Sequence, residues 1–152
     1  MSTPLIENCT FHRNTAATDG GALSCINAAP KCINCTFVDN VAGRWGGALY
    51  VDFQPRIRLI NSIIAFNTQG EGGSLWIREY FQSDFRIKCC DIYGNAGGDW
   101  IHPYEGYYGY LGNIASDPCF CNQEGPALTL EEGSPCLTDS CGTMGGWSVG
   151  CE

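Results

Sequence analysis

A short glycine-containing motif recurs along residues 1–100 and limits the possible folds more than any other feature of the sequence. The motif consists of two glycines, a small or polar residue and a large apolar residue, and its copies begin at positions 20, 46, 72 and 97. The copies are Gly20-Gly21-Ala22-Leu23, Gly46-Gly47-Ala48-Leu49, Gly72-Gly73-Ser74-Leu75 and the looser Gly97-Gly98-Asp99-Trp100. A period of about 26 residues over four copies indicates stacked repeats, each of which buries its apolar face against its neighbours.

A second motif precedes each glycine pair and keeps nearly the same period. Phe-x-x-Asn occupies residues 11–14 and 37–40, and weaker copies end at Asn67 and Asn95. We expect the four closing asparagines to form a ladder of side-chain amides at a tight turn, because asparagine tolerates left-handed backbone geometry. The paired glycines would supply positive φ angles at another corner of the repeat.

Each repeat also contains two short stretches in which inward and outward residues alternate, as in a half-buried β-strand. Alignment of the repeats places similar residues in columns. The columns expected to face inward are Ile6, Cys32, Leu59 and Ile87; Phe11, Phe37, Ile64 and Ile92; and Leu23, Leu49, Leu75 and Trp100. Because strands stack at about 4.8 Å, we predict an all-β parallel β-helix, or β-solenoid, of about four rungs over residues 1–100.

The charge of the chain argues against two classes of partner. The sequence has 16 acidic and 8 basic residues and a net charge of −8. Such a surface repels phosphate backbones and anionic lipids, so we expect no nucleic-acid partner. The sequence has no run of roughly 18 apolar residues, so we expect no membrane insertion. Its first residues also have neither the basic nor the apolar region of a signal peptide.

The repeats resemble a known group of proteins. Phe-x-x-Asn followed by Gly-Gly-Ala-Leu, within residues 11–23 and 37–49, resembles the repeats of bacterial secreted right-handed β-helix proteins of the polymorphic outer-membrane and pectate-lyase-like types. The cysteine-containing tail resembles the C-terminal end segment of many such proteins. This resemblance implies a right-handed β-helix and a secreted or cell-surface location. It does not select a function, because the group includes lyases, hydrolases and adhesins.

The first repeat begins close to Met1, so we expect no N-terminal cap over its strands. Uncovered strand edges offer backbone groups for pairing with another chain or segment. We therefore expect either that this sequence is the C-terminal portion of a longer β-helix or that it self-associates through its first rung.

The composition changes after residue 100. Residues 101–116 are rich in aromatic residues and glycine and predict a loop insertion. Residues 117–152 hold five of the eleven cysteines, namely Cys119, Cys121, Cys136, Cys141 and Cys151. Closely spaced cysteines in a segment of low apolar content predict a C-terminal cap held by disulfides, and hence an oxidising compartment.

The cysteines of the repeats suggest a different role. Cys9, Cys35 and Cys90 share one column, which predicts reduced thiols that pack in the core as small apolar residues. Cys32 and Cys35 have the spacing of a zinc half-site. However, residues three apart in a strand face opposite sides, and no second pair has suitable spacing. We therefore predict no metal site.

Two groups of residues are candidate binding sites. In the first, Tyr50 and Trp76 should stack one rung apart on an outward face, beside Asp52 and Arg78. Sugar C–H groups pack on aromatic rings, and sugar hydroxyl groups bond to charged side chains, so this face could bind a polysaccharide or another glycan. The alternative is an ordinary packing pair with a surface ion pair.

The second group lies in the aromatic insertion. Trp100, His102, Tyr104 and Tyr107 could contact a glycan, and Glu105 could supply an acid. Loops on rigid scaffolds often carry function. The alternative is that these aromatic side chains fold over the end of the helix as a lid on its core.

Catalysis would need carboxyl groups on neighbouring rungs. Sugar hydrolysis uses two carboxyl groups roughly 5–9.5 Å apart, and Asp52 with Glu79, or Asp39 with Asp91, are candidate pairs. Glu105 is a further catalytic candidate. A lyase would instead use Ca²⁺ and a basic group, whereas a hydrolase would need no cofactor.

The function most consistent with these features is directed at carbohydrate. The favoured hypothesis is a polysaccharide hydrolase or lyase, and the alternative is a non-catalytic surface, adhesive or glycan-binding segment. The outward column of Lys31, Arg58 and Arg86 could pair with anionic sugars in either case.

Overall fold

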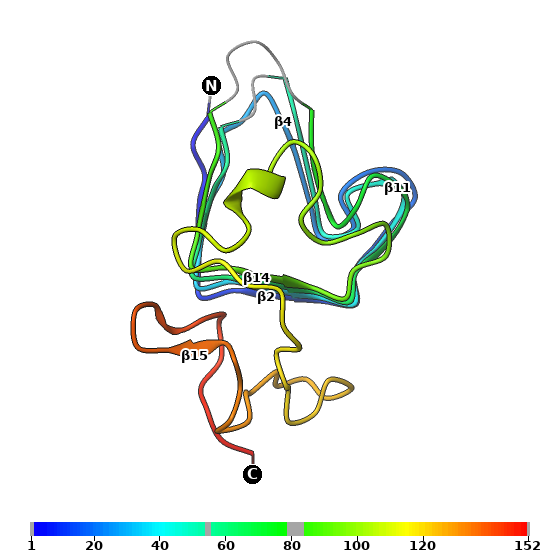
Figure 1. The fold of residues 1–152 in the computed structure, drawn as a ribbon. Helices are drawn as coiled ribbons and strands as arrows, with labels where there is room; N and C mark the ends of the chain where they lie inside the picture. Colours follow the sequence, from blue (N-terminus) through cyan, green and yellow to red (C-terminus); the bar gives the residue numbers. More distant parts are fainter. Residues whose placement is uncertain (1, 54–55, 79–83, 152) are drawn as a thin grey trace.

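The repeats coil around an apolar core as a parallel β-solenoid, seen in a computed structural model that describes residues 2–53, 56–78 and 84–151. Figure 1 shows successive coils almost superimposed. Each full coil contributes four short strands, and equivalent strands pair in parallel to form four sheets. Two sheets have four strands and two have three, so three coils are complete and the fourth is partial.

We name each sheet by its first strand. The β1 sheet contains β1 (Leu5–Glu7), β5 (Lys31–Ile33), β9 (Arg58–Ile60) and β13 (Arg86–Lys88). The β2 sheet contains β2 (Thr10–His12), β6 (Thr36–Val38), β10 (Ile63–Ala65) and β14 (Asp91–Tyr93). The β3 sheet contains β3 (Thr15–Ala16), β7 (Val41–Trp45) and β11 (Thr68–Glu71). The β4 sheet contains β4 (Leu23–Ile26), β8 (Leu49–Asp52) and β12 (Leu75–Ile77).

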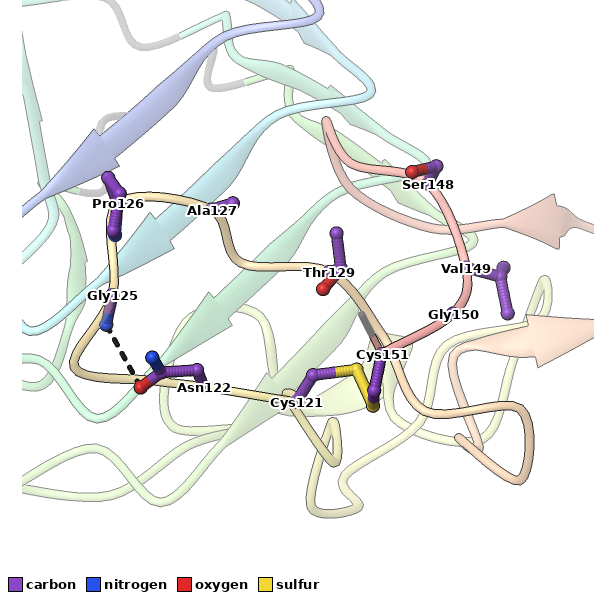
Figure 2. Close-up of a pocket in the computed structure, with 10 residues that line it drawn as sticks. All are labelled: Cys121, Asn122, Gly125, Pro126, Ala127, Thr129, Ser148, Val149, Gly150 and Cys151. Carbon is purple, nitrogen blue, oxygen red and sulfur yellow. Dashed lines mark hydrogen bonds between the residues drawn. A yellow bond between two sulfur atoms is a disulfide. The ribbon is translucent and has the colours of Figure 1, made fainter.

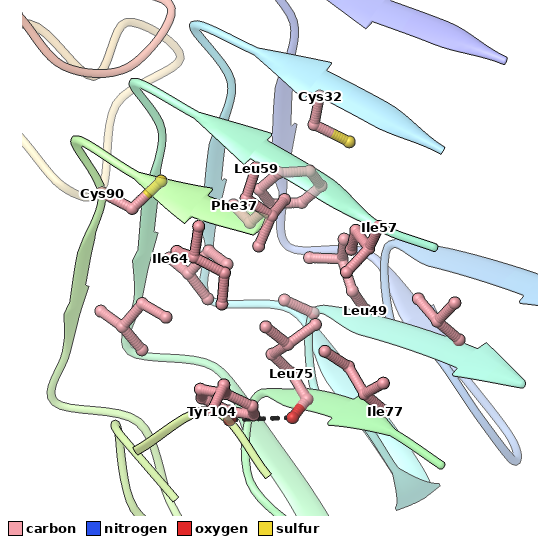
Figure 3. Close-up of a cluster of buried hydrophobic side chains, with 14 of the residues drawn as sticks. Cys32, Phe37, Leu49, Ile57, Leu59, Ile64, Leu75, Ile77, Cys90 and Tyr104 are labelled. Carbon is pink, nitrogen blue, oxygen red and sulfur yellow. Dashed lines mark hydrogen bonds between the residues drawn. The ribbon is translucent and has the colours of Figure 1, made fainter. Parts of the chain in front are cut away.

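The predicted columns are confirmed by the strand register. The register pairs are Ile6, Cys32, Leu59 and Ile87; Phe11, Phe37, Ile64 and Ile92; and Leu23, Leu49 and Leu75. The rings of Phe11 and Phe37 stack with centroids 4.8 Å apart, which is the spacing of one strand. Figure 3 shows the buried side chains of this core. Trp100 differs from the expected column, because it packs against the core from outside any strand.

The predicted asparagine ladder is present at the corner between the β2 and β3 sheets. Asn14 Nδ2 donates to Asn40 Oδ1 at 2.9 Å, and the same bond continues at 2.9 Å from Asn40 to Asn67 and from Asn67 to Asn95. The left-handed residue, however, is the one before each asparagine, such as Asp39 with φ of 54°. The ladder asparagines therefore act through their side chains and not through an unusual backbone.

A second asparagine ladder, which the sequence interpretation missed, lies between the β1 and β2 sheets. Asn34 Nδ2 donates to Asn8 Oδ1 at 3.1 Å, and Asn61 Nδ2 donates to Asn34 Oδ1 at 2.8 Å. These three asparagines do have left-handed backbone, with φ between 51° and 53°. Here asparagine supplies both the turn geometry and the amide ladder.

The two positions of the glycine pair have different roles, as the first two coils show. Gly46 has φ of 66°, a left-handed value that suits a residue without Cβ. Gly21 is needed for close approach, because a Cβ there would lie 2.1 Å from the carbonyl oxygen of Gly47 in the next coil. The motif thus combines a sharp corner with tight stacking of backbone on backbone.

The aromatic insertion closes the end of the core. Residues 100–113 include the 3₁₀ helix η1 (Glu105–Tyr107), which lies across the interior of the coil in Figure 1. Tyr104 is fully buried, and its hydroxyl donates to the carbonyl oxygen of Leu75 at 2.9 Å. For Tyr104, the alternative that the insertion folds over the core as a lid is therefore correct. We call residues 100–113 the lid.

The C-terminal segment does not cover the end of the solenoid. It packs against the outer surface of the β2 sheet, below β14 and β2 in Figure 1. Val38, Ile63 and Ala65 of that sheet form a second apolar cluster with residues of the segment, namely Leu128, Leu130, Cys136 and Met144. The segment contains the short antiparallel strands β15 (Leu137–Thr138) and β16 (Gly142–Thr143). This lateral cap shields apolar residues that would otherwise face water.

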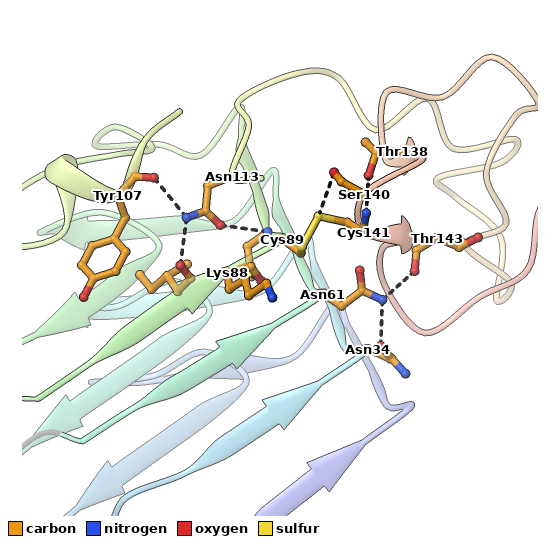
Figure 4. Close-up of a disulfide and its surroundings, with 12 residues drawn as sticks. Asn34, Asn61, Lys88, Cys89, Tyr107, Asn113, Thr138, Ser140, Cys141 and Thr143 are labelled. Atoms are coloured by element: carbon orange, nitrogen blue, oxygen red, sulfur yellow. Dashed lines mark hydrogen bonds between the residues drawn. A yellow bond between two sulfur atoms is a disulfide. The ribbon is translucent and has the colours of Figure 1, made fainter. Parts of the chain in front are cut away.

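Two disulfides hold this lateral cap, as predicted. Cys89–Cys141 joins it to the corner after β13, and Cys121–Cys151 closes a loop within it. Figure 4 shows the first disulfide beside the Asn34–Asn61 ladder, where Asn61 Nδ2 also donates to the carbonyl oxygen of Thr143 at 2.7 Å. The cap is therefore anchored by a covalent bond and by a hydrogen bond to Asn61 at the end of a ladder.

Cys9, Cys35 and Cys90 are free thiols, as predicted. The argument that Cys32 and Cys35 face opposite sides is wrong, because both are fully buried in the core. The left-handed residue Asn34 turns the chain between them, so Cys32 on β5 and Cys35, just before β6, both face the interior. Within residues 2–53, 56–78 and 84–151, no group of three or more metal-binding side chains is present.

Candidate functional site: an aromatic and charged corner

Three aromatic side chains meet where the β3 sheet joins the β4 sheet. β8 and β12 place Tyr50 and Trp76 in register, and their rings stack with centroids 4.9 Å apart and an interplanar angle of 13°. Trp45, at the end of β7, stacks on Trp76 at 5.1 Å and 15°. The left-handed corner at Gly46 turns the chain immediately after Trp45. We call Trp45, Tyr50 and Trp76 the aromatic corner.

A buried carboxylate supports this corner from within. Asp52 Oδ2 accepts a hydrogen bond from the Tyr50 hydroxyl at 2.7 Å and lies 3.4 Å from Arg78 Nη1. Asp52 Oδ1 accepts a hydrogen bond from the backbone N–H of Phe53 at 2.7 Å. Burial, and then the bond to Asp52, raise the pKa of Tyr50 to about 12. Tyr50 therefore remains a neutral donor at physiological pH, and it holds the carboxylate in place.

Charged groups surround the exposed rim of the corner. The guanidinium of Arg44 lies 4.2 Å from the ring centroid of Trp45, and that of Arg78 lies 5.3 Å from Trp76, both within cation–π range. Arg44 also pairs with Asp19 at 2.6 Å, and this hydrogen bond lowers the pKa of the Asp19 carboxyl group. Trp45 Nε1 donates to Glu71 Oε2 at 3.2 Å. Aromatic surface and both signs of charge thus occur together.

The structure confirms the predicted stacking of Tyr50 on Trp76 but corrects their exposure. Tyr50 and Asp52 are buried, although the strand alternation predicts that they face outward. Trp45 stacks beside Tyr50 at 6.3 Å and helps to enclose it. Trp76 is half-buried, and Arg78 is exposed. The accessible part of this predicted site therefore consists of Trp76 and Arg78.

Sequence reasoning missed Trp45 and Arg44. Trp45 immediately precedes the glycine pair of the second repeat, and its equivalents in the neighbouring coils are Asp19 and Glu71. That column contains two acids and one tryptophan at a corner, which is a detectable pattern. What the pattern does not reveal is that the corner directs this column towards the next sheet.

The predicted catalytic residues have separate surroundings. Glu79 lies outside the described residues. Glu105 is exposed in the lid, where its Oε1 lies 3.3 Å from His102 Nδ1. Asp52 instead contacts Tyr50 and Arg78. Each of the two described carboxylates thus has its own set of neighbours.

Three of the four predicted binding residues of the insertion, Trp100, Tyr104 and Tyr107, have structural contacts. Tyr104 is fully buried, so it cannot contact a ligand as predicted. The Tyr107 hydroxyl donates to the carbonyl oxygen of Phe85 at 2.7 Å, and Trp100 Nε1 donates to that of Ile114 at 3.0 Å. These bonds satisfy the polar atoms of half-buried side chains that cover the core. His102 is the exposed member of this group.

The second predicted carboxylate pair lies beneath or beside the lateral cap. Asp91 is fully buried, and its oxygens accept hydrogen bonds from Ser116 N at 3.1 Å and Cys136 Sγ at 3.2 Å. Burial raises the pKa of Asp91 to about 7. Asp39 lies 3.5 Å from His12 Nε2 and accepts a hydrogen bond from Gln123 Nε2 at 3.0 Å. Both carboxylates have contacts that join the solenoid to its cap.

A pocket of about 390 Å³ lies within the lateral cap, between residues 121–129 and residues 148–151 (Figure 2). The pocket is lined by Cys121, Asn122, Gly125, Pro126, Ala127, Thr129, Ser148, Val149, Gly150 and Cys151. Its side-chain polar groups are one amide and two hydroxyls, and its two cysteines form a disulfide. This lining offers hydrogen bonds but contains no carboxyl or imidazole group for acid–base chemistry.

Comparison with known proteins found a family similarity for two coils of this solenoid. Residues 8–26 and 34–52 match the Chlamydia polymorphic membrane protein repeat. The comparisons with curated proteins and with solved structures found no match. Among the described residues, no helix is long and apolar enough to span a membrane. The chain is therefore a parallel β-helix repeat protein, two coils of which are similar to a bacterial polymorphic membrane protein repeat.

Proposed function

We propose that this protein is a non-catalytic β-helix segment of a secreted or cell-surface protein and that it binds glycans at the aromatic corner. The observation that carries the proposal is the stack of Trp45, Trp76 and Tyr50 with Arg78 beside the half-buried Trp76. Rings held by their neighbours lose little conformational freedom when a sugar packs against them. Arg44, Arg78 and the exposed Glu71 can then bond to sugar hydroxyl groups.

The geometry favours binding over bond cleavage. The side chain of Asp52 is only 4% exposed, and its oxygens accept hydrogen bonds from Tyr50 and from the backbone of Phe53. A general acid or nucleophile must reach the glycosidic bond. The contacts of Asp52 instead suit a carboxylate that positions Tyr50 and Arg78.

Two observations support an extracytoplasmic location. The disulfides Cys89–Cys141 and Cys121–Cys151 suit an oxidising compartment. The similarity of two coils to a polymorphic membrane protein repeat suits the cell surface. A repeated scaffold that presents side chains outward fits a surface role.

Retention on insoluble neutral glycans, such as cellulose and chitin, tests the proposal. We expect Trp76→Ala to weaken retention of the intact chain at least about tenfold, because a central aromatic contact commonly dominates such a site. Tyr110→Ala is the matched control, since Tyr110 is an exposed aromatic residue of the lid. Equal retention of the wild type and Trp76→Ala would rule out the aromatic corner.

An activity assay tests the non-catalytic part of the proposal. Reducing ends and absorbance at 235 nm would be followed on a panel of polysaccharides, with and without Ca²⁺. We expect no product from the wild type. Product that disappears in Asp52→Asn, in Glu79→Gln or in Glu105→Gln would show instead that the protein is a hydrolase or lyase.

A further inference from the structure

Basic residues gather on one sheet of this acidic protein. Five of its eight basic residues lie on the β1 sheet or in the two residues before β9, namely Lys31, Arg56, Arg58, Arg86 and Lys88. The acidic residues described on the same sheet and its approach are Glu7 and Asp84. The outer surface of the β1 sheet is therefore cationic, whereas the whole chain has a net charge of −8.

The register aligns three of these charges along the solenoid axis. Lys31 pairs with Arg58, and Arg58 pairs with Arg86, in adjacent parallel strands. The next residues along these strands, Cys32, Leu59 and Ile87, are fully buried, so the basic side chains point outward. The column thus presents one cation on each of the three strands β5, β9 and β13, at a spacing of about 4.8 Å. Like charges directly opposite each other destabilise a sheet unless counter-charges are present.

Protein side chains neutralise little of this charge. Arg58 Nη2 lies 2.8 Å from Asp84 Oδ2, and this bond lowers the pKa of the Asp84 carboxyl group. Within residues 2–53, 56–78 and 84–151, no ion-pair partner lies within 4.0 Å of Lys31, Arg86 or Lys88. Three basic groups of the sheet are therefore available to an external anion.

The shape of the surface restricts which anion fits. Ile33 and Ile60 lie next to the basic column and are half-buried, so they offer a narrow apolar strip beside the charges. A sugar ring can pack its C–H groups on this strip while its anionic groups meet the column. A broad duplex or a membrane would also approach the acidic remainder of the molecule, which repels it.

We propose that the outer surface of the β1 sheet binds a linear polysaccharide that carries carboxylate or sulfate groups, aligned with the solenoid axis. The ligand would place successive anionic groups against Lys31, Arg58 and Arg86. This surface lies on the opposite side of the coil from the β11 lobe and the aromatic corner, as Figure 1 shows. It uses none of the residues of the proposed neutral-glycan site, so either site can fail without the other.

Binding of the full chain to heparin and to polygalacturonate, with neutral dextran as a reference, tests this inference. We expect both anionic polymers to bind at about 0.1 M salt and to dissociate at about 1 M, as the screening length falls from ~10 to ~3 Å. The variant Lys31→Gln with Arg86→Gln should bind roughly tenfold more weakly, because it removes two of the three aligned charges that would pair with the anionic groups.

The control is Arg13→Gln, which removes a positive charge from another surface. This variant should bind heparin as the wild type does, and circular dichroism should show that the control and the double variant are folded. The inference is overturned if Lys31→Gln with Arg86→Gln binds normally, if the control loses equal affinity, or if neither polymer binds. Equal or tighter binding of duplex DNA or of phosphatidylserine vesicles would also overturn it.

Discussion

At the scale of single residues, each asparagine inside the buried ladder satisfies its hydrogen bonds through its neighbours in the adjacent coils. Asn67 Nδ2 donates to Asn95 Oδ1 and to the carbonyl oxygen of Phe37, and Asn40 N and Nδ2 donate to Asn67 Oδ1. Loss of the Asn67 side chain removes the acceptor of Asn40 N and a donor to the carbonyl oxygen of Phe37, and an unsatisfied buried group costs about 1–3 kcal/mol. The ladder therefore couples the stability of each coil to that of its neighbours.

We predict that Asn67→Ala lowers the free energy of unfolding by about 2–4 kcal/mol, because it leaves a donor and an acceptor unsatisfied. Urea unfolding followed by circular dichroism measures this loss. Asn14→Ala is the control, since Asn14 is exposed at the end of the ladder and should cost less than about 1 kcal/mol. Equal losses for the two variants would contradict a cooperative ladder.

Asp91 makes the stability depend on pH in an unusual direction. Its pKa is raised by burial to about 7 in the folded protein, from an ordinary value of 3.8. Between these values the folded state holds a proton that the unfolded state has lost, so this group destabilises the protein as pH rises from about 4 to 7.

We predict that Asp91→Asn raises the Tm at pH 7.5 but has little effect at pH 4. The side-chain oxygen of asparagine can still accept a hydrogen bond from Ser116, and the variant has no charge to bury. Thermal unfolding at several pH values measures the difference between variant and wild type. Asp139→Asn, on the exposed surface, is the control. A difference that does not change with pH would show that Asp91 is not the responsible group.

At the scale of elements, the repeats were predictable because they obey local rules. The alternation of residues, the glycine corners and the Phe-x-x-Asn motif each specify a strand or a turn, and together they fix the register of Phe11 on Phe37. The position of the lateral cap was not predictable in this way. Its contacts, such as Leu128 and Met144 against Ile63, are remote in sequence and have no periodic pattern.

The candidate site was predictable only in part, for a related reason. Strand alternation correctly stacks Tyr50 on Trp76, because both occupy one column. It cannot predict that Trp45 encloses Tyr50, since that contact depends on how the chain turns at Gly46. The same limitation explains the error about Cys32 and Cys35. A corner between two residues changes which side each one faces.

The disulfide Cys89–Cys141 should determine how firmly the lateral cap is held. It joins cysteines 52 residues apart in sequence, and a cross-link of this length stabilises the folded state by about 4 kcal/mol because it lowers the entropy of the unfolded chain. We predict that Cys89→Ser with Cys141→Ser increases amide hydrogen exchange in residues 117–150 and on β10 beneath them. Cys121→Ser with Cys151→Ser is the control, because this disulfide lies within the cap and does not tether it. Unchanged exchange in the first variant would show that apolar packing alone holds the cap.

At the scale of the whole molecule, the solenoid separates two kinds of surface. The aromatic corner combines stacked rings with neighbouring charges, whereas the β1 sheet concentrates basic groups on a chain with a net charge of −8. Binding at the first surface should depend mainly on ring contacts and change little with salt. Binding at the second surface should weaken steeply with salt, because exposed charges are screened. One rigid scaffold would thus recognise two chemical classes of glycan.

The most direct measurement is a glycan array probed with the full chain at about 0.1 M and about 1 M salt, alongside Trp76→Ala and the variant Lys31→Gln with Arg86→Gln. We predict that neutral glycans bind at both salt concentrations and are lost only in Trp76→Ala. Anionic glycans should bind only at low salt and be lost only in the double variant. Absence of glycan binding by the folded wild type, or binding unaffected by either substitution, would contradict a glycan-binding solenoid.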